Sequence, residues 1–175
     1  KELCLNHKVI ICYRPLMALA GSFKRMKWDF KEFEDLINFF PPNSIKSLRF
    51  KANDKISSNV VGAIQFYELF YNYMNSINSN KNLYFFSQQE FSTDPIEEIT
   101  NVLKWLELEV SDEIIQLSQS LNKGKSSQIH IPDQSIQHDP DYNKKYSNEY
   151  YKLVLTKEEI DLICLLYTSD AADDA

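Results

Sequence analysis

An arginine and a serine eight positions apart carry the most chemically specific pattern in the chain. They follow Lys8–Tyr13, a short apolar run rich in β-branched residues, which is typical of a strand buried on both faces of a parallel sheet. Arg14 comes directly after this run, and Pro15 suits the first turn of a helix. Ser22 lies about two helical turns further on, so the guanidinium and the hydroxyl could meet one anion.

This pair has two interpretations. Ligands of parallel-sheet folds bind where strands end and helices begin, because a helix N-terminus offers N–H groups and partial positive charge. An arginine fork with a hydroxyl is suited to a phosphate monoester. The same residues also describe a surface arginine and a solvated helical serine. From the residues alone, this plainer interpretation is favoured.

The composition limits the classes of ligand. The chain has 175 residues, 43% hydrophobic and 25% charged, which is typical of one soluble globular domain. A formal charge of -6 argues against general electrostatic binding to nucleic acid or to an anionic membrane. No apolar run is long enough to cross a bilayer. Three glycines leave no room for a glycine-rich phosphate loop. An anionic ligand therefore needs a local site built from side chains.

The cysteines and histidines do not form a metal-ligand pattern. The three cysteines are widely spaced without a C-x-x-C pair, and the three histidines do not cluster. These six residues are Cys4, Cys12, Cys164, His7, His130 and His138. We expect no zinc site, and we expect His138 to be a solvent-exposed loop residue.

The remaining pattern predicts an α/β fold with parallel strands flanked by helices. A second strand is expected at Asn82–Ser87. Asp94 and Pro95 are a strong helix start, and Thr156 with Glu159 forms a capping box for the last helix. The helices are expected at about 16–26, 30–40, 57–77, 95–106 and 111–121 and from 156 onward, and a long polar loop at 122–147. This order contains two β-α units and no hairpin signal.

Two segments resemble one enzyme family. KVIICYRPLMALAGSFKRM resembles the 3′-phosphate-binding strand, loop and helix of sulfotransferases that use 3′-phosphoadenosine 5′-phosphosulfate (PAPS), where the motif is R-x-P-x-x-x-x-x-S. Arg14 and Ser22 keep the motif's spacing, although Pro15 follows the arginine directly instead of one residue later.

The second segment, NLYFFSQQEFSTDPIEEITNVLKWLELEVSDEII, resembles the family's later strand with its Y-E-D-L, D-P-x-x-E-I and F-L-G-L motifs. Asp94-Pro95 and Glu98-Ile99 are in register. The Y-E-D-L positions are occupied by Gln88 to Phe91, and the usual glycine is Glu107. The resemblance covers roughly residues 8–117.

The resemblance implies a truncated P-loop NTPase-like sulfotransferase domain. Arg14 and Ser22 would hold the 3′-phosphate of PAPS or of adenosine 3′,5′-bisphosphate. Lys123 and Gly124 would be the remainder of the family's Arg-Lys-Gly cofactor loop. The full protein would transfer a sulfuryl group to a hydroxyl or amine acceptor, for which carbohydrate, protein tyrosine, lipid and small alcohols all fit. Localisation cannot be read from this segment.

The family's 5′-phosphate loop and catalytic base have no counterpart in this sequence. We therefore expect residues 1–163 to be the C-terminal portion of a single sulfotransferase domain, without catalytic residues and inactive alone. Residues 164–175 resemble a translated sequencing adapter, and we expect a non-native tail that cannot continue the last helix. A natural acidic tail is the alternative.

Two other functions remain open. The same architecture serves P-loop kinases and other nucleotide enzymes, because a fold alone does not determine function. The chain could also be a non-catalytic helical interaction module that uses the aromatic residues between Phe66 and Tyr73. Burial of this aromatic stripe against the sheet is the favoured interpretation.

Overall fold

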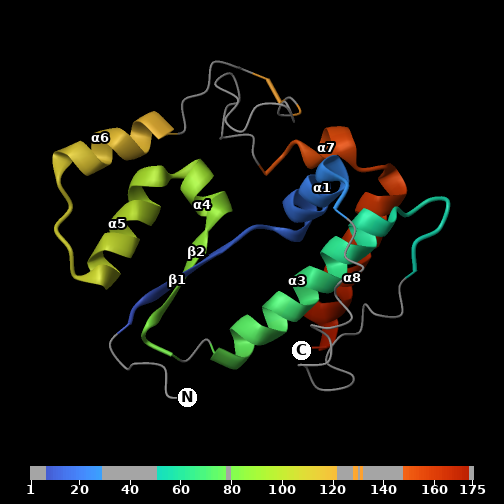
Figure 1. Cartoon of the computed structure of the whole chain (residues 1–175), viewed down its shortest axis with the longest axis horizontal. Coiled ribbons are helices and arrows are strands. Elements are labelled where there is room, and N and C mark those ends of the chain that lie inside the picture. The colour runs from blue at the N-terminus through green and yellow to red at the C-terminus, as the bar shows by residue number, and fades with distance from the viewer. Residues whose placement is uncertain are drawn as a thin grey trace. The chain divides into compact units, whose positions relative to one another are not determined.

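The computed structural model describes residues 7–28, 51–77, 80–121, 128–129, 131 and 148–173 (Figure 1). The chain divides into two compact units. The sheet unit comprises Lys1–Pro15 and Ile77–Glu149, and the helical unit comprises Leu16–Ser76 and Tyr150–Ala175. The single domain expected over residues 1–163 stays a prediction.

The sheet unit is built on two parallel strands. β1 (Val9–Tyr13) pairs with β2 (Leu83–Ser87), in a register that runs from Val9 opposite Leu83 to Tyr13 opposite Ser87. Parallel strands require a long crossover, and the chain between them contains α1 (Leu16–Met26) and α3 (Ser58–Ile77). The predicted strands and the mixed α/β class are confirmed.

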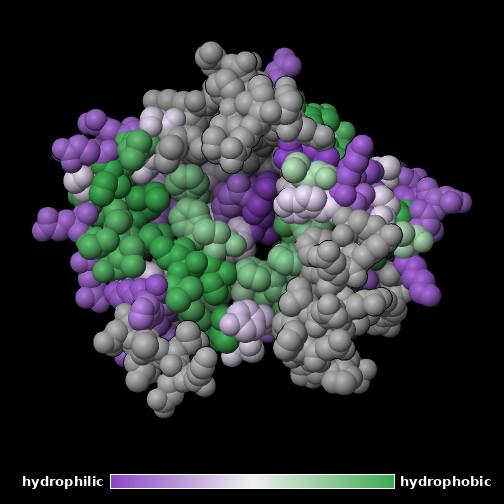
Figure 2. All heavy atoms as spheres, viewed as in Figure 1, coloured by the Kyte–Doolittle hydropathy of each residue, from purple (hydrophilic) through white to green (hydrophobic). Residues whose placement is uncertain are grey.

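β1 is less covered than its sequence predicts. Val9 and Ile10 are 44% and 41% exposed, and Figure 2 shows apolar residues at the surface over β1. α5 (Pro95–Leu106) packs against β2. The prediction of a strand buried on both faces is therefore wrong for the described part of the chain.

A helix that the sequence analysis missed follows β2 directly. α4 (Gln88–Thr93) begins after Ser87, whose Oγ accepts a hydrogen bond from the backbone N–H of Glu90 at 3.2 Å. Serine followed three residues later by glutamate is a capping pattern, so the signal was present in the sequence.

The predicted helix starts at Asp94 and Ser111 are confirmed. Asp94 accepts a hydrogen bond from the N–H of Glu97 at 3.0 Å, and Pro95 is the first residue of α5. Ser111 Oγ accepts from the N–H of Ile114 at 3.4 Å at the start of α6 (Asp112–Leu121). These short-range patterns place the helices that follow β2.

In the part of the helical unit that the structure describes, the helices are α1, α3, α7 (Tyr151–Val154) and α8 (Lys157–Asp173). α7 and α8 pack against α1, and the shared core is apolar. Its buried members are Leu16, Ala20, Phe23, Val60, Ala63, Ile64, Leu155 and Ile163. The helices predicted around residues 16–26 and 57–77 are confirmed, whereas the helix predicted at 30–40 lies outside the described residues.

α8 continues further than predicted. It runs to Asp173, so the expectation that residues 164–175 cannot continue the last helix is wrong. Leu166 is partly buried against the apolar core, and Ala171 and Ala172 belong to the residue type with the highest helix propensity. The non-native origin of this segment stays a prediction.

Among the described helices, α1 and α5 end in a left-handed residue that is not glycine. Glu107 has φ 64° after α5, and Lys27 has φ 54° after α1. The N–H of Leu108 bonds to the carbonyl of Leu103 at 2.9 Å, which is the hydrogen bond of a Schellman cap. A side chain in this conformation costs roughly 1 kcal/mol relative to glycine.

We therefore predict that Glu107→Gly raises the free energy of unfolding by about 1 kcal/mol, since glycine adopts this conformation without strain. The lost ion pair with Lys8 involves a carboxylate that is 85% exposed and contributes little. Urea denaturation measures the change. Glu109→Gly, two residues further along in the same loop, is the control and should not stabilise. A lower unfolding midpoint for Glu107→Gly than for the wild type would contradict the prediction.

Candidate functional site

Arg14 lies at the carboxyl end of β1 in the sheet unit. Because Tyr13 is paired with Ser87, Arg14 and Gln88 are the first residues beyond the two paired strand ends. Arg14 is half-buried, and α4 begins at Gln88. The strand ends therefore place Arg14 at the edge of the sheet where ligands of parallel folds bind.

Glu98 fixes α5 to the same end of β2. Its side chain is buried, and its carboxylate accepts a hydrogen bond from the backbone N–H of Ser87 at 3.4 Å and another from the hydroxyl of Tyr84. Burial is the main cause that raises the pKa of Glu98. Burial, with the charges of Glu98 and Glu90, raises the pKa of Tyr84 to about 12. Glu98 thus positions the strand end rather than presenting a charge to solvent.

Ser22 lies on α1 in the helical unit, and its hydroxyl is hydrogen-bonded to the hydroxyl of Tyr150. The guanidinium carbon of Arg25 lies 5.8 Å from the centre of the Tyr150 ring. Lys24 donates to Glu159 at 2.6 Å. Ser22 is half-buried, and its contact with Tyr150 shows that its hydroxyl is not exposed to solvent alone.

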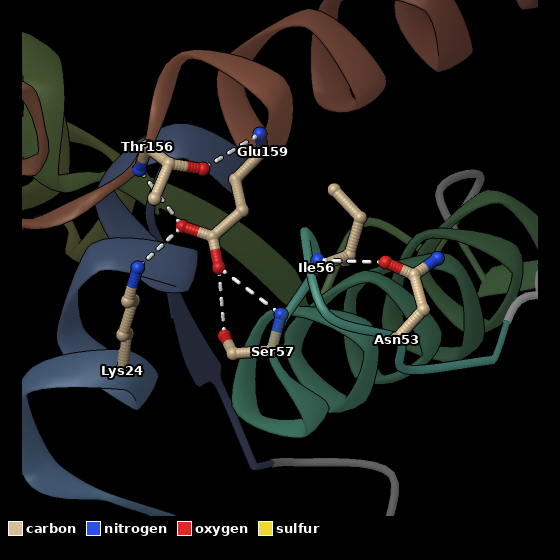
Figure 3. Close-up of polar contacts among 6 residues, drawn as sticks. All are labelled: Lys24, Asn53, Ile56, Ser57, Thr156 and Glu159. Atoms are coloured by element: carbon tan, nitrogen blue, oxygen red, sulfur yellow. Dashed lines mark hydrogen bonds and ion pairs between the residues drawn. The ribbon is translucent and has the colours of Figure 1, made fainter.

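Glu159 is the most connected of the buried polar residues described in the helical unit (Figure 3). Its side chain is 1% exposed. One carboxylate oxygen accepts from Lys24 and from the N–H of Thr156 at 2.9 Å, while the other accepts from the N–H and Oγ of Ser57 at 3.1 and 2.8 Å. The Glu159 N–H donates to Thr156 Oγ1 at 3.3 Å, so the predicted capping box is confirmed.

The pKa of Glu159 reflects these contacts. Burial by itself raises the pKa, but the hydrogen bonds from Lys24, Thr156 and Ser57 outweigh it and lower the pKa below its usual value of 4.5. The folded state therefore favours the ionised carboxylate. This contribution to stability is present above the usual pKa and is lost as the pH falls through the lowered one.

The other proposed cofactor residues are not joined into one described site. Arg14 belongs to the sheet unit and Ser22 to the helical unit, so their meeting at one anion stays a prediction. Lys123 and Gly124 lie outside the described residues, as do His130 and His138.

The sequence analysis missed the part played by Tyr150. The Ser22–Tyr150 hydrogen bond spans 128 positions, and the Lys24–Glu159 ion pair spans 135. Neither contact leaves a local spacing pattern. The one available signal was the capping box. It identified Glu159 as a helix-start residue, but it did not identify Lys24 on α1 and Ser57 before α3 as its partners.

Among the residues that the structure describes, no three histidine, cysteine or acidic side chains lie close enough to hold a metal ion. The same part of the chain contains no helix that is both long and apolar enough to span a membrane.

Comparison of the chain with protein-family models, with curated proteins and with solved structures finds no match. The case for a function therefore rests on the residues and their geometry.

We predict that Glu159→Gln lowers the free energy of unfolding by about 3 kcal/mol, because it leaves Lys24 without its charged partner in a largely buried setting. Acid should also destabilise the variant less than the wild type below the usual glutamate pKa of 4.5, since the variant lacks the titrating carboxyl. Denaturation at several pH values measures both effects.

The matched control is Glu158→Gln, which removes the same charge from the neighbouring exposed residue of α8. It should change stability by only a few tenths of a kcal/mol. Equal stabilities of the two variants would show that the contacts of Glu159 do not hold the helical unit together.

Proposed function

We propose that this chain is part of a PAPS-dependent sulfotransferase and binds the 3′-phosphate of the cofactor through Arg14 and Ser22. The observation that carries the proposal is the parallel pairing of β1 with β2. The segment after each strand carries one of the two sulfotransferase-like motifs, and Arg14 lies at the shared carboxyl edge. A P-loop NTPase-like arrangement of the complete sheet belongs to the same proposal.

The second motif gains support from the roles of its residues. Asp94 caps α5, Pro95 occupies its first position, and Glu98 bonds to the end of β2. Glu107, which replaces the family's glycine, is in the left-handed conformation that glycine adopts most easily. At these positions the side chains make the capping contacts, and the backbone has the conformation, that suit the residue types of the family's motif. This supports the alignment on which the assignment of Arg14 depends.

The proposed role of Arg14 and Ser22 is cofactor positioning. In sulfuryl transfer, an acceptor hydroxyl or amine attacks the sulfur of PAPS in line, and adenosine 3′,5′-bisphosphate leaves. The 3′-phosphate takes no part in bond making, so contacts to it hold the reacting sulfur in place. Arg14 offers a bidentate fork to two phosphate oxygens, and Ser22 offers a hydroxyl. Lys123 and Gly124 are proposed to approach the same phosphate.

A helical interaction module is the second candidate. Tyr71 and Tyr73 on α3 are 52% and 49% exposed, which favours contact with a partner. Phe66 and Tyr67, on the same helix, are partly buried against the apolar core of the helical unit. Much of the aromatic stripe therefore serves internal packing, and the cofactor-binding function remains the better supported of the two.

We predict that the 175-residue chain binds adenosine 3′,5′-bisphosphate more tightly than ATP, and that Arg14→Ala weakens this binding by about 1.5–3 kcal/mol, the range for a hydrogen bond to a charged group. Isothermal titration calorimetry measures both affinities. Lys104→Ala is the control, because it removes one exposed positive charge from α5 in the same unit.

Equal effects of Arg14→Ala and Lys104→Ala would refute a specific contact and leave only general electrostatics. Tighter binding of ATP than of the bisphosphate would favour a kinase-like nucleotide enzyme instead.

A further inference from the structure

In the part of the chain that the structure describes, each unit contains one buried glutamate. Glu98 on α5 in the sheet unit is 5% exposed, and Glu159 on α8 in the helical unit is 1% exposed. The two side chains have different kinds of partner. We infer that they form a pH-sensitive device, in which acid loosens the helical unit at Glu159 and strengthens the attachment of α5 to β2 at Glu98. This inference is independent of the proposed function.

The partners of Glu159 suit a carboxylate rather than a neutral carboxyl group. One oxygen accepts from Lys24 Nζ at 2.6 Å and from the N–H of Thr156 at 2.9 Å, and neither of these groups can accept a hydrogen bond. The other oxygen accepts from the N–H and the hydroxyl of Ser57. A proton on the carboxyl group would displace a donor and leave Lys24 without its counter-charge. Acid therefore weakens the contact that joins α8 to α1 and to Ser57 before α3.

The partners of Glu98 suit a neutral carboxyl group. Glu98 accepts from the N–H of Ser87 at 3.4 Å and is hydrogen-bonded to the hydroxyl of Tyr84. A hydroxyl can accept as well as donate. The neutral group can therefore keep both contacts, because its carbonyl oxygen accepts from Ser87 and its own proton is donated to Tyr84. Protonation costs no hydrogen bond here, and it removes the cost of burying a charge.

The charges carried by the helices around Glu98 are mostly negative. Among the described elements, α5 packs against β2, α4 and α6, and none of these three contains a lysine or an arginine. Glu90 on α4 and Glu97 on α5 both make ionisation of Glu98 less favourable. α6 contributes two further acidic residues in its first turn, Asp112 and Glu113. The surroundings of Glu98 therefore oppose a negative charge.

The nearest cations of the sheet unit do not neutralise Glu98. Lys104 lies in the last turn of α5, and Arg14 follows β1. Lys8 forms its ion pair with Glu107, at the far end of α5. Within the described residues, Glu98 has no ion pair, whereas Glu159 is paired with a lysine. The two buried carboxyl groups thus differ in charge environment as well as in hydrogen bonding.

The pKa directions determine the order of events on acidification. Burial, with the charges of Glu90 and Glu97, raises the pKa of Glu98 although its two hydrogen bonds act the other way. The stability from its protonated form is complete below the usual pKa of 4.5 and is lost as the pH rises through the raised one. The pKa of Glu159 is lowered, so its contribution is lost below 4.5. As the pH falls, α5 gains stability first and the helical unit loses it next.

The test is amide hydrogen exchange of the 175-residue chain, read in peptides from α5 and from α8 and corrected for the intrinsic exchange rate at each pH. Glu98→Gln keeps a neutral side chain at every pH. We expect it to protect α5 about three- to tenfold more than the wild type at neutral pH, and about equally near pH 4. Glu159→Gln should lower protection of α8 by more than about tenfold at neutral pH, and this deficit should shrink in acid.

Glu97→Gln and Glu158→Gln are the matched controls, because each removes the charge of the exposed neighbour on the same helix. Both should change protection by less than about twofold. Carbon-13 NMR of the wild-type glutamate carboxyls tests the inference without any substitution, with a midpoint above 4.5 for Glu98 and below 4.5 for Glu159. The inference is overturned if Glu98→Gln behaves like Glu97→Gln, if the effects of the two buried substitutions change with pH in the same direction, or if both midpoints lie on one side of 4.5.

Discussion

The carboxylate of Glu159 joins the helical elements on which the candidate phosphate residue Ser22 depends. It binds Lys24 of α1, Ser57 before α3, and the first turn of its own helix α8. A carboxylate with a side-chain exposure of 1% is costly to bury, and it stays ionised only because donors surround it. The apolar core supplies most of the attraction between these helices but is not directional. Glu159 supplies the direction, because one of its oxygens accepts from Lys24 of α1 and the other from Ser57 before α3.

This constraint also fixes the orientation of the faces of α1. Leu16, Ala20 and Phe23 lie in the apolar core, while Lys24 is held by Glu159. The arrangement leaves Ser22 toward Tyr150, which enters just before α7. Residues 150–159 therefore hold the helices together through Glu159. The same segment also places Tyr150 against Ser22, the candidate phosphate residue. The stability of the helical unit and the placement of Ser22 therefore depend on the same stretch of sequence.

Contacts between residues close in the sequence could be predicted, whereas contacts between distant residues could not. Asp94, Ser111 and Thr156 cap helices through contacts three residues away, and the sequence predicted all three. The apolar runs predicted both strands, since a parallel pair needs only two such runs with a long crossover. The contacts of Tyr150 and Lys24 could not be predicted, because they depend on the return of the chain after more than 100 residues. The exposure of β1 escaped prediction for a related reason: burial depends on which elements cover a strand, and the strand's own sequence does not encode them.

The positions of the glycines bear on how the proposed phosphate site would be built. Of its three glycines, Gly21 lies where α1 and Tyr151 approach too closely for a Cβ atom. The left-handed helix ends, which glycine would relieve, are instead occupied by Lys27 and Glu107. A backbone cradle for an anion requires several adjacent residues with this freedom, and the sequence does not provide them. A phosphate site of the proposed kind would therefore use side chains, and long-range packing would orient them. The contact between buried Tyr150 and Ser22, beside the close approach at Gly21, shows how such packing fixes the position of a side-chain hydroxyl.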